Sequence, residues 1–158
     1  MNREVRAFHR KHGFPLDEPM PTEKDTALLE LGFGMNDCSD DILPQSLEVG
    51  DNRLYRAHLM LEEMSEMLLA LGNADRIKVA DAGADLLYVV IGTLETYGID
   101  AKQVFDAVHA SNMTKSVRSI EDQRMRSKGP HYHPPQIAEA IRRGEESRAW
   151  NQSIGELE

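Results

Sequence analysis

The sequence has a single cysteine, Cys38, so the chain cannot form an internal disulfide, which fits a reducing compartment. No apolar run is long enough to span a membrane, and the first 20 residues lack the charged and apolar parts of a secretory signal. Basic residues are scarce as well: 18 Lys and Arg face 27 Asp and Glu, and the net charge of −9 disfavours nucleic-acid binding. We expect a cytoplasmic protein with neither a membrane nor a nucleic acid as partner.

Motifs of common enzyme classes are also missing. The sequence has no Walker loop, no Gly-x-Gly-x-x-Gly turn and no nucleophile elbow. No alternation of apolar and polar residues is long enough to build a sheet. Apolar residues instead recur every three or four positions along two segments, 51–71 and 75–97, as in amphipathic helices. The sequence therefore predicts an all-α fold.

The two long helices are expected to form an antiparallel pair, because only residues 72–74 separate them. Gly72 fits the position just after the first helix, and Asp75 fits the N-cap of the second. Shorter helices are predicted over residues 2–12, 22–33 with Thr22 as cap, 100–113 with Asp100 as cap, and 135–143. Residues 34–50 favour an irregular segment, which could be a lid, a base pocket or an inert insertion.

At 158 residues the chain has the size of one domain. We expect a variable N-terminal part (1–50), a central part with the long helices (51–115), and a C-terminal part (116–158) with a closing loop, a short helix and a frayed tail. Both long helices are apolar on more than one side. A monomer of this size would not easily cover that surface, so self-association is expected.

Five acidic side chains lie on the facing sides of the two long helices. Apolar residues flank them on the helical wheel, so we expect the acids to be buried. Buried carboxylates without a basic neighbour destabilise a fold, and a hard divalent cation such as Mg²⁺ or Mn²⁺ resolves the conflict. The pattern favours a metal site over an ordinary solvated charged face. The five residues are Glu62, Glu63, Glu66, Asp81 and Asp85.

Residues suited to phosphate follow further along the chain. Asn112 and Lys115 lie one turn apart at the end of a predicted helix and could hold phosphate oxygens, although both could equally well only cap that helix. Lys128 ends the only locally basic segment, which includes Arg118, Arg124 and Arg126 and either closes over a phosphate or forms a solvated loop. Tyr132 could stack on a base.

Four stretches, in this order and spacing, resemble the all-α nucleoside triphosphate pyrophosphohydrolases, which include MazG-like and phosphoribosyl-ATP pyrophosphohydrolase-like enzymes. They are LEEMSE (61–66), ADLLYVV (84–90), GID (98–100) and ASNMTK (110–115), and the likeness covers roughly residues 51–135.

The family pattern is Glu-x-x-Glu followed by Glu-x-x-Asp. Glu63 and Glu66 match the first pair, Glu62 matches an extra acid that often precedes it, and Asp85 matches the last position. Ala82 stands where the family has its third Glu, so Asp81 either replaces that residue or reaches the cation only through another ligand.

The resemblance implies a MazG-like helical bundle that forms a homodimer or homotetramer and cleaves a nucleoside triphosphate to the monophosphate and pyrophosphate. It also implies that the acids bind Mg²⁺ or Mn²⁺ and that Glu63 or Glu66 activates the attacking water. The substrate would be held by Asn112, Lys115, Lys128 and Tyr132. A purine deoxynucleotide such as dGTP or dATP is slightly favoured, as for some phage-encoded relatives.

Two other functions stay open. One is a dUTP or dUDP hydrolase of the same superfamily. The other, of a different class, is a non-catalytic helical oligomer that binds a nucleotide or a protein partner without turnover. Glutamate-to-glutamine substitutions would leave the behaviour of such an oligomer unchanged.

Overall fold

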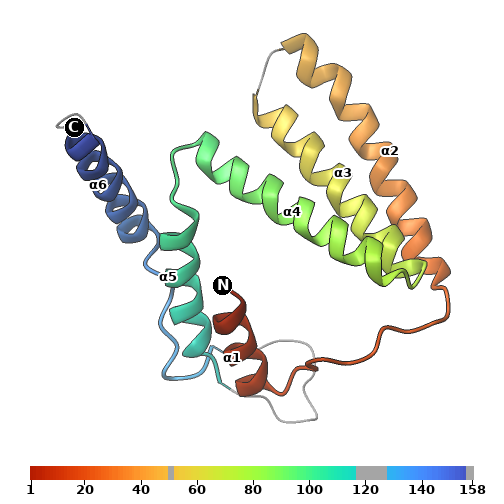
Figure 1. The fold of residues 1–158 in the computed structure, drawn as a ribbon, viewed down its shortest axis with the longest axis horizontal. Coiled ribbons are helices and arrows are strands. Elements are labelled where there is room, and N and C mark those ends of the chain that lie inside the picture. Colours follow the sequence, from red (N-terminus) through yellow and green to blue (C-terminus); the bar gives the residue numbers. More distant parts are fainter. Residues whose placement is uncertain (50–51, 117–127, 156–158) are drawn as a thin grey trace. The chain divides into compact units, whose positions relative to one another are not determined.

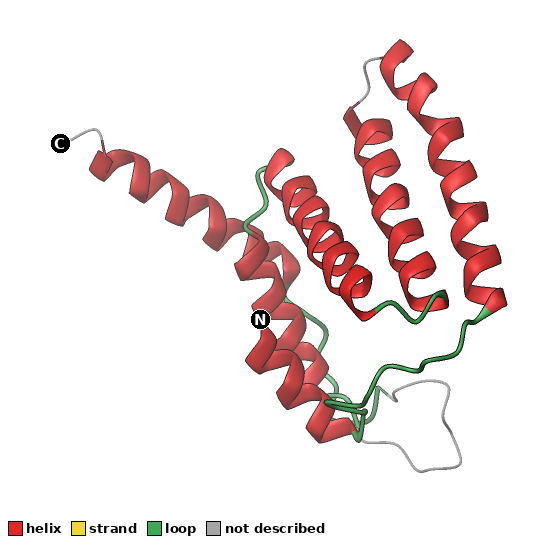
Figure 2. Ribbon diagram, turned by 45° about the vertical axis from the view of Figure 1, so that its right-hand side comes forward, coloured by secondary structure: helices red, strands yellow, loops and turns green. Residues whose placement is uncertain are grey.

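The computed structural model describes residues 1–49, 52–116 and 128–155, and within these ranges it contains six helices and no strand (Figures 1 and 2). The all-α prediction is therefore confirmed. The helices are α1 (Asn2–His12), α2 (Thr26–Val49), α3 (Asn52–Gly72), α4 (Arg76–Thr96), α5 (Ala101–Met113) and α6 (Ile137–Gly155). None of the described helices is both long enough and apolar enough to cross a membrane.

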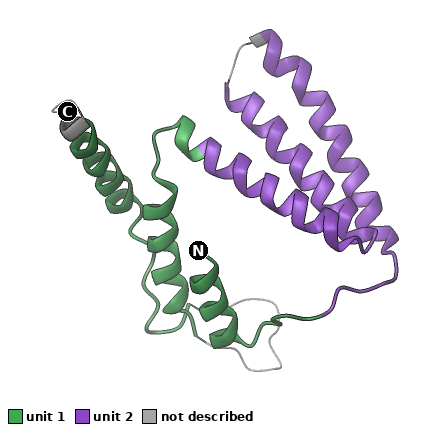
Figure 3. Ribbon diagram, viewed as in Figure 1, with its two compact units in different colours: residues 1–18, 94–158 green, residues 19–93 purple. Residues whose placement is uncertain are grey.

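The chain divides into two compact units (Figure 3). Pro19–Thr93 contains α2, α3 and most of α4, whereas Met1–Glu18 and Leu94–Glu158 together contain α1, the end of α4, α5 and α6. The five acidic residues singled out above belong to the Pro19–Thr93 unit. The four residues predicted to bind the substrate belong to the other unit.

Helices α2 and α3 lie side by side and run in opposite directions (Figures 1 and 2). Buried serines join them at two levels. Near the start of α2, the Ser65 hydroxyl donates a hydrogen bond to the Gly32 carbonyl over 2.9 Å. Further along, Ser39 Oγ lies 2.8 Å from His58 Nδ1. Because Ser39 and Ser65 are each only 1% exposed, the two contacts fix the register of α3 on α2.

The prediction of an irregular segment over residues 34–50 is wrong, because α2 is helical through Val49. The helix also begins later than predicted: Asp25, not Thr22, caps it and accepts the backbone N–H of Ala27 over 3.0 Å. Pro44 lies inside the helix, where it removes only one backbone donor. Packing of α2 along α3 outweighs this loss and the weak local helix propensity.

The turn between α3 and α4 also differs from the prediction. Gly72 is the last residue of α3, and the left-handed conformation falls on Ala74, with a φ of 54°. Gly72 is needed for a close approach instead, since a Cβ atom there would lie 2.9 Å from the Leu29 side chain and 3.0 Å from the Asp25 carbonyl. Asp75 caps α4 as predicted, accepting the N–H of Ile77 over 3.0 Å.

In the other unit, α5 packs against both α1 and α6. Its predicted N-cap is confirmed, because Asp100 Oδ1 accepts the backbone N–H of Gln103 over 3.0 Å. At its other end, the Lys11 ammonium of α1 donates to the Met113 carbonyl. Lysine is suited to a helix C-terminus, where carbonyls lack intrahelical partners.

Helix α6 is longer than the predicted 135–143, reaching Gly155. Gly144 does not end it, because this glycine is buried where a Cβ atom would lie 2.7 Å from Asp100 Cβ. Arg142 also forms ion pairs with Glu139 and Glu146, one turn before and after it. Such pairs support an exposed helix modestly.

Few apolar side chains are fully buried. Among the described residues, the buried apolar ones are Ala70, Ala82 and Ala140. Helix α4 is left partly uncovered within this chain: Ile77 is 82% exposed, Leu87 57% and Tyr88 80%. The larger apolar side chains of α4 thus face outward along one part of the helix.

Replacing Gly32 and Gly34 by alanine separately tests the close contact between α2 and α3. A Cβ atom at Gly32 would lie 2.8 Å from Leu69 Cγ, whereas at Gly34 it would meet nothing within 4 Å. We expect Gly34→Ala to raise the free energy of unfolding by about 1 kcal/mol through helix propensity, and Gly32→Ala to lower it by about 1–2 kcal/mol through overpacking. Urea denaturation measures both values. Equal stabilisation by the two substitutions would contradict the described contact.

Candidate functional site

Helices α3 and α4 face each other in antiparallel register. A Cβ atom at Gly83 would lie 3.1 Å from Met67 Cε, and one at Gly92 would lie 3.4 Å from Arg56 Nη1. Residue numbers rise along one helix as they fall along the other, so Asp85, between Gly83 and Gly92, lies level with a residue between Met67 and Arg56. That is the turn of α3 that carries the glutamates. The two helices therefore carry acids at the same height.

Glu63 shows the electrostatic consequence of this register. Partial burial raises the pKa of its carboxyl, and the negative charges of four neighbouring carboxylates raise that pKa further. In decreasing order of effect, the neighbours are Glu66, Asp85, Glu62 and Asp81. The other four predicted acids are thus close enough to repel a negative charge on Glu63.

The acids are not buried as expected. Glu66, Asp81 and Asp85 are exposed, and the Glu62 side chain is 45% exposed. The apolar neighbours seen on the helical wheel do not cover the acids, because one of them, Leu69, lies against Gly32 of α2 instead. In their present positions, no three His, Cys, Asp or Glu side chains of the described residues lie close enough to hold one metal ion.

The departure from the family pattern has a structural counterpart. Ala82, which occupies the position of the missing glutamate, is only 3% exposed. The side chain of a glutamate at position 82 would start from a buried Cβ atom. Asp81 is exposed instead, and its negative charge raises the pKa of the Glu63 carboxyl. Asp81 is therefore the acid through which α4 adds a second negative charge beside Asp85.

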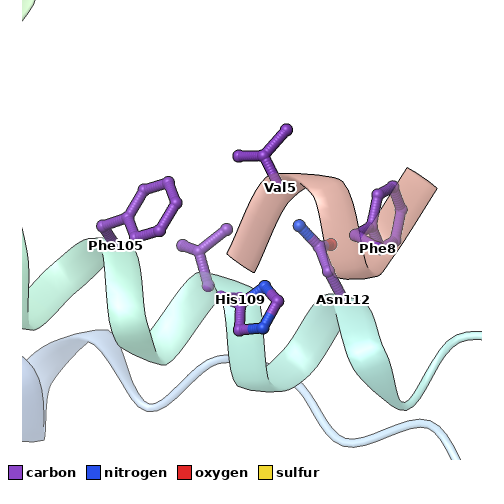
Figure 4. A pocket seen from close by; sticks show the side chains of 6 residues that line it. Val5, Phe8, Phe105, His109 and Asn112 are labelled. Atoms are coloured by element: carbon purple, nitrogen blue, oxygen red, sulfur yellow. The ribbon is translucent and has the colours of Figure 1, made fainter. Parts of the chain in front are cut away.

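Asn112 lies in the other unit, on α5. Its side chain points towards α1 and lines a small pocket of about 70 Å³ (Figure 4). The other lining residues are Val5, Phe8, Phe105, Val108 and His109. An amide among apolar and aromatic groups suits a polar group of a ligand better than a bare phosphate, which needs positive charge.

The other predicted substrate-binding residues follow α5. Lys115 is half-buried in the turn after that helix, and its backbone N–H donates to the Asn112 carbonyl over 3.2 Å. Lys128 is exposed, with its ammonium 5.1 Å from the centre of the Tyr132 ring. Arg118, Arg124 and Arg126 lie outside the described residues.

The segment that carries Tyr132 is fixed to the end of α5. The Ser111 hydroxyl donates to the His133 carbonyl over 2.7 Å, and the His133 N–H donates to Thr114 Oγ1 over 2.9 Å. Thr114 Oγ1 itself donates to the Ser111 carbonyl over 2.7 Å. This hydrogen-bonded anchor ties Tyr132 and Lys115 to the same helix end.

Sequence reasoning missed Arg56 on α3. Its Nε atom is buried without a hydrogen-bond partner, and Gly92 of α4 leaves room for its guanidinium. Arg56 and Glu63 are seven residues apart and therefore share a face of α3. The sequence gave no sign of this contact, because a glycine at position 92 does not tell which residue of α3 lies against it.

The chain was compared with known protein families, curated proteins and solved structures. Residues 43–112 match the family model described as phosphoribosyl-ATP pyrophosphohydrolase. No curated protein and no solved structure matches the chain. The matched segment contains all five acids of the candidate site and ends at Asn112.

The raised pKa of Glu63 predicts a pH-dependent stability. The folded protein holds this proton more tightly than the unfolded chain does, so stability falls as the pH rises above the ordinary carboxyl value of 4.5. Glu63→Gln removes the negative charge. At pH 7 without divalent cations it should raise the melting temperature, and it should raise the free energy of unfolding by less than about 1 kcal/mol, since the site is partly solvated. Near pH 4 the gain should disappear.

Scanning calorimetry at the two pH values measures this difference. Glu30→Gln, at an exposed acid of α2, is the control and should show no pH-dependent gain. A Glu63→Gln protein that is less stable than the wild type at pH 7 would contradict the repulsion inferred here.

Proposed function

We propose, from the premise that residues 43–112 belong to the phosphoribosyl-ATP pyrophosphohydrolase family, that this protein cleaves a nucleoside triphosphate to the monophosphate and pyrophosphate. The family gives the reaction class, which is hydrolysis of a phosphoric anhydride bond. The observation that carries the proposal is the set of five carboxylates on α3 and α4, gathered around Glu63 inside the matched segment.

Magnesium or manganese is the proposed cofactor, because carboxylate oxygens are the ligands that hard divalent cations prefer. Glu62, Glu66 and Asp85 would hold the cation, together with Glu63 and with Asp81 in place of the missing glutamate. When bound, the cation would neutralise charge on the phosphate oxygens and on the transition state. The exposed side chains of Glu66, Asp81 and Asp85 have room to converge on an ion.

The reaction transfers the α-phosphoryl group to water. The water oxygen forms a bond to the α-phosphorus, the bond to the bridging oxygen of the β-phosphate breaks, and pyrophosphate leaves. Glu63 takes the proton from the water, with Glu66 as the second catalytic carboxylate.

The residues around α5 are proposed to bind the substrate. Lys115 and Lys128 carry the positive charge that phosphate oxygens need, and Tyr132 offers a ring for stacking on the base. Asn112 supplies an amide that can donate and accept hydrogen bonds. A purine deoxynucleotide, dGTP or dATP, is the substrate we propose, with dUTP or dUDP as the alternative within the superfamily.

The protein is further proposed to act as a homodimer or homotetramer. On α4, Ile77 and Tyr88 lie within about 20° of each other on the helical wheel, and Leu87 lies about 80° away. Their exposed fractions are 82%, 80% and 57%, so α4 offers large apolar side chains that a partner could cover. A second copy of the chain is the partner that this face fits.

A nucleotide panel tests the proposed activity. The canonical deoxynucleoside triphosphates, dUTP, dUDP and phosphoribosyl-ATP are incubated with the protein and Mg²⁺ or Mn²⁺, and monophosphate and pyrophosphate are scored. We expect turnover of a purine deoxynucleotide and a loss of at least about 100-fold in kcat/KM for Glu66→Gln, since a cation ligand is removed.

Glu30→Gln is the matched control and should keep the wild-type rate. Binding of a nucleotide without turnover under both metals would favour the non-catalytic oligomer. Wild-type turnover by Glu66→Gln would show that the carboxylates of α3 and α4 do not form the site.

Sedimentation velocity tests the self-association. The wild type should sediment as a dimer or tetramer, and Tyr88→Arg should weaken association at least tenfold, or about 1.4 kcal/mol. Leu47→Arg, at a 70% exposed position of α2, should leave the mass unchanged. A monomeric wild type at micromolar concentration would contradict the proposal.

A further inference from the structure

Arg56 is a positively charged residue at the contact between α3 and α4 that the proposed reaction does not use. Its side chain is half-buried, and its Nε atom is buried without a hydrogen-bond partner. No acid of the described residues forms an ion pair with it. Burying part of a charged group without a partner is costly, so this guanidinium needs an account.

The position of the guanidinium is fixed by α4. A Cβ atom at Gly92 would lie 3.4 Å from Arg56 Nη1, so the guanidinium lies directly against this part of α4. Arg56 and Glu63 are seven residues apart on α3, a rise of about 10.5 Å along the helix axis. Gly92 and Asp85 are also seven residues apart on α4. The guanidinium and the acids therefore lie along the same line of contact, about two turns from each other.

The chemistry of the guanidinium selects the kind of ligand. It has five N–H donors in a planar fork and pairs with carboxylate or phosphate oxygens. The nearest carboxylates of the site lie about two turns away along the contact, and none of them pairs with Arg56 in the described residues. A bound anion would supply the missing partner. In the reaction of the matched family, the phosphate chain is the anionic part of the substrate.

We propose that Arg56 binds the β- and γ-phosphates of the nucleotide, the part that leaves as pyrophosphate. The proposal rests on the proposed function, in which Glu63 takes a proton from water beside the α-phosphate. Arg56 shares a face of α3 with Glu63 but lies about two turns away, so the two side chains do not meet at the same phosphate. The rest of the phosphate chain extends from the α-phosphate towards Arg56.

Binding there would serve the reaction in two ways. The guanidinium offsets part of the negative charge of the five acids, which otherwise repels a polyanionic substrate. It also pairs with the leaving group, whose negative charge grows as the bond to the bridging oxygen breaks. Because packing against α4 already holds the guanidinium in place, little ordering is needed when the phosphates bind.

Binding of inorganic pyrophosphate to the full-length protein tests the proposal without catalysis. Isothermal titration calorimetry in MgCl₂ compares pyrophosphate with dGMP, which lacks the β- and γ-phosphates. Arg56→Gln should weaken pyrophosphate binding by about 10- to 100-fold, because charged hydrogen bonds are lost, and dGMP binding by less than about threefold. No loss for pyrophosphate, or an equal loss for both ligands, would overturn the proposal.

Two further variants serve as controls in the same titration. Arg76→Gln removes the same charge from an exposed position at the start of α4 and should change neither affinity. Arg56→Lys keeps the charge but loses the planar fork, so its affinity for pyrophosphate should lie between those of the wild type and Arg56→Gln. Equal losses for Arg76→Gln and Arg56→Gln would show that only the overall charge matters, which would contradict the assignment.

A measurement on the wild type does not depend on whether the variants fold. The ¹H–¹⁵N resonance of Arg56 Nε reports on its guanidinium, and pyrophosphate should shift this resonance, whereas dGMP should not. The Nε resonance of Arg76 should respond to neither ligand. An Arg56 resonance that stays in place at saturating pyrophosphate would overturn the assignment.

None of these titrations contains a triphosphate, so their outcomes are independent of turnover. A protein that binds pyrophosphate through Arg56 but cleaves no nucleotide would contradict only the proposed function. A protein that cleaves nucleotides but binds pyrophosphate equally well with and without Arg56 would contradict only the role of Arg56.

Discussion

The antiparallel register of α3 and α4 is the constraint on which the candidate site depends. It is fixed by a short turn that Asp75 caps and by two places where glycine admits a side chain of α3, Gly83 for Met67 and Gly92 for Arg56. One turn of slip would carry Asp85 away from Glu63 and relieve the repulsion that raises the pKa of the Glu63 carboxyl. The repulsion persists because packing elsewhere holds the helices in place.

Helix α2 supplies that packing from the opposite side. At 100° per residue, Glu63 and Arg56 lie about 160–180° around α3 from Ser65, which hydrogen-bonds to α2. Helix α3 is thus held between a polar, close-packed contact with α2 and a charged face towards α4. His58 belongs to the contact with α2 through Nδ1, and its Nε2 lies 3.8 Å from Glu62 Oε2.

The sequence predicted the parts of the fold that local chemistry determines. The amphipathic periods, the caps Asp75 and Asp100 and the pairing of α3 with α4 all follow from residues close together in the chain. The helical state of residues 34–49 does not, because Ser39 is stabilised by His58, 19 residues away, in spite of Pro44. The five acids stay a prediction from the sequence, and the prediction that they are buried is wrong, since burial depends on which neighbours each helix face receives. The close approach that requires Gly72 could not be predicted from the sequence, because it depends on the position of Leu29 in α2.

The central claim is that the carboxylates of α3 and α4 together bind one divalent cation. A crystal structure of the protein with Mn²⁺ and a non-hydrolysable deoxynucleoside triphosphate tests it most directly, because the metal is located by its anomalous scattering. The account predicts an anomalous peak between Glu62, Glu66 and Asp85, with the triphosphate bound to it. A peak elsewhere, or a bound nucleotide without metal between these side chains, would contradict it.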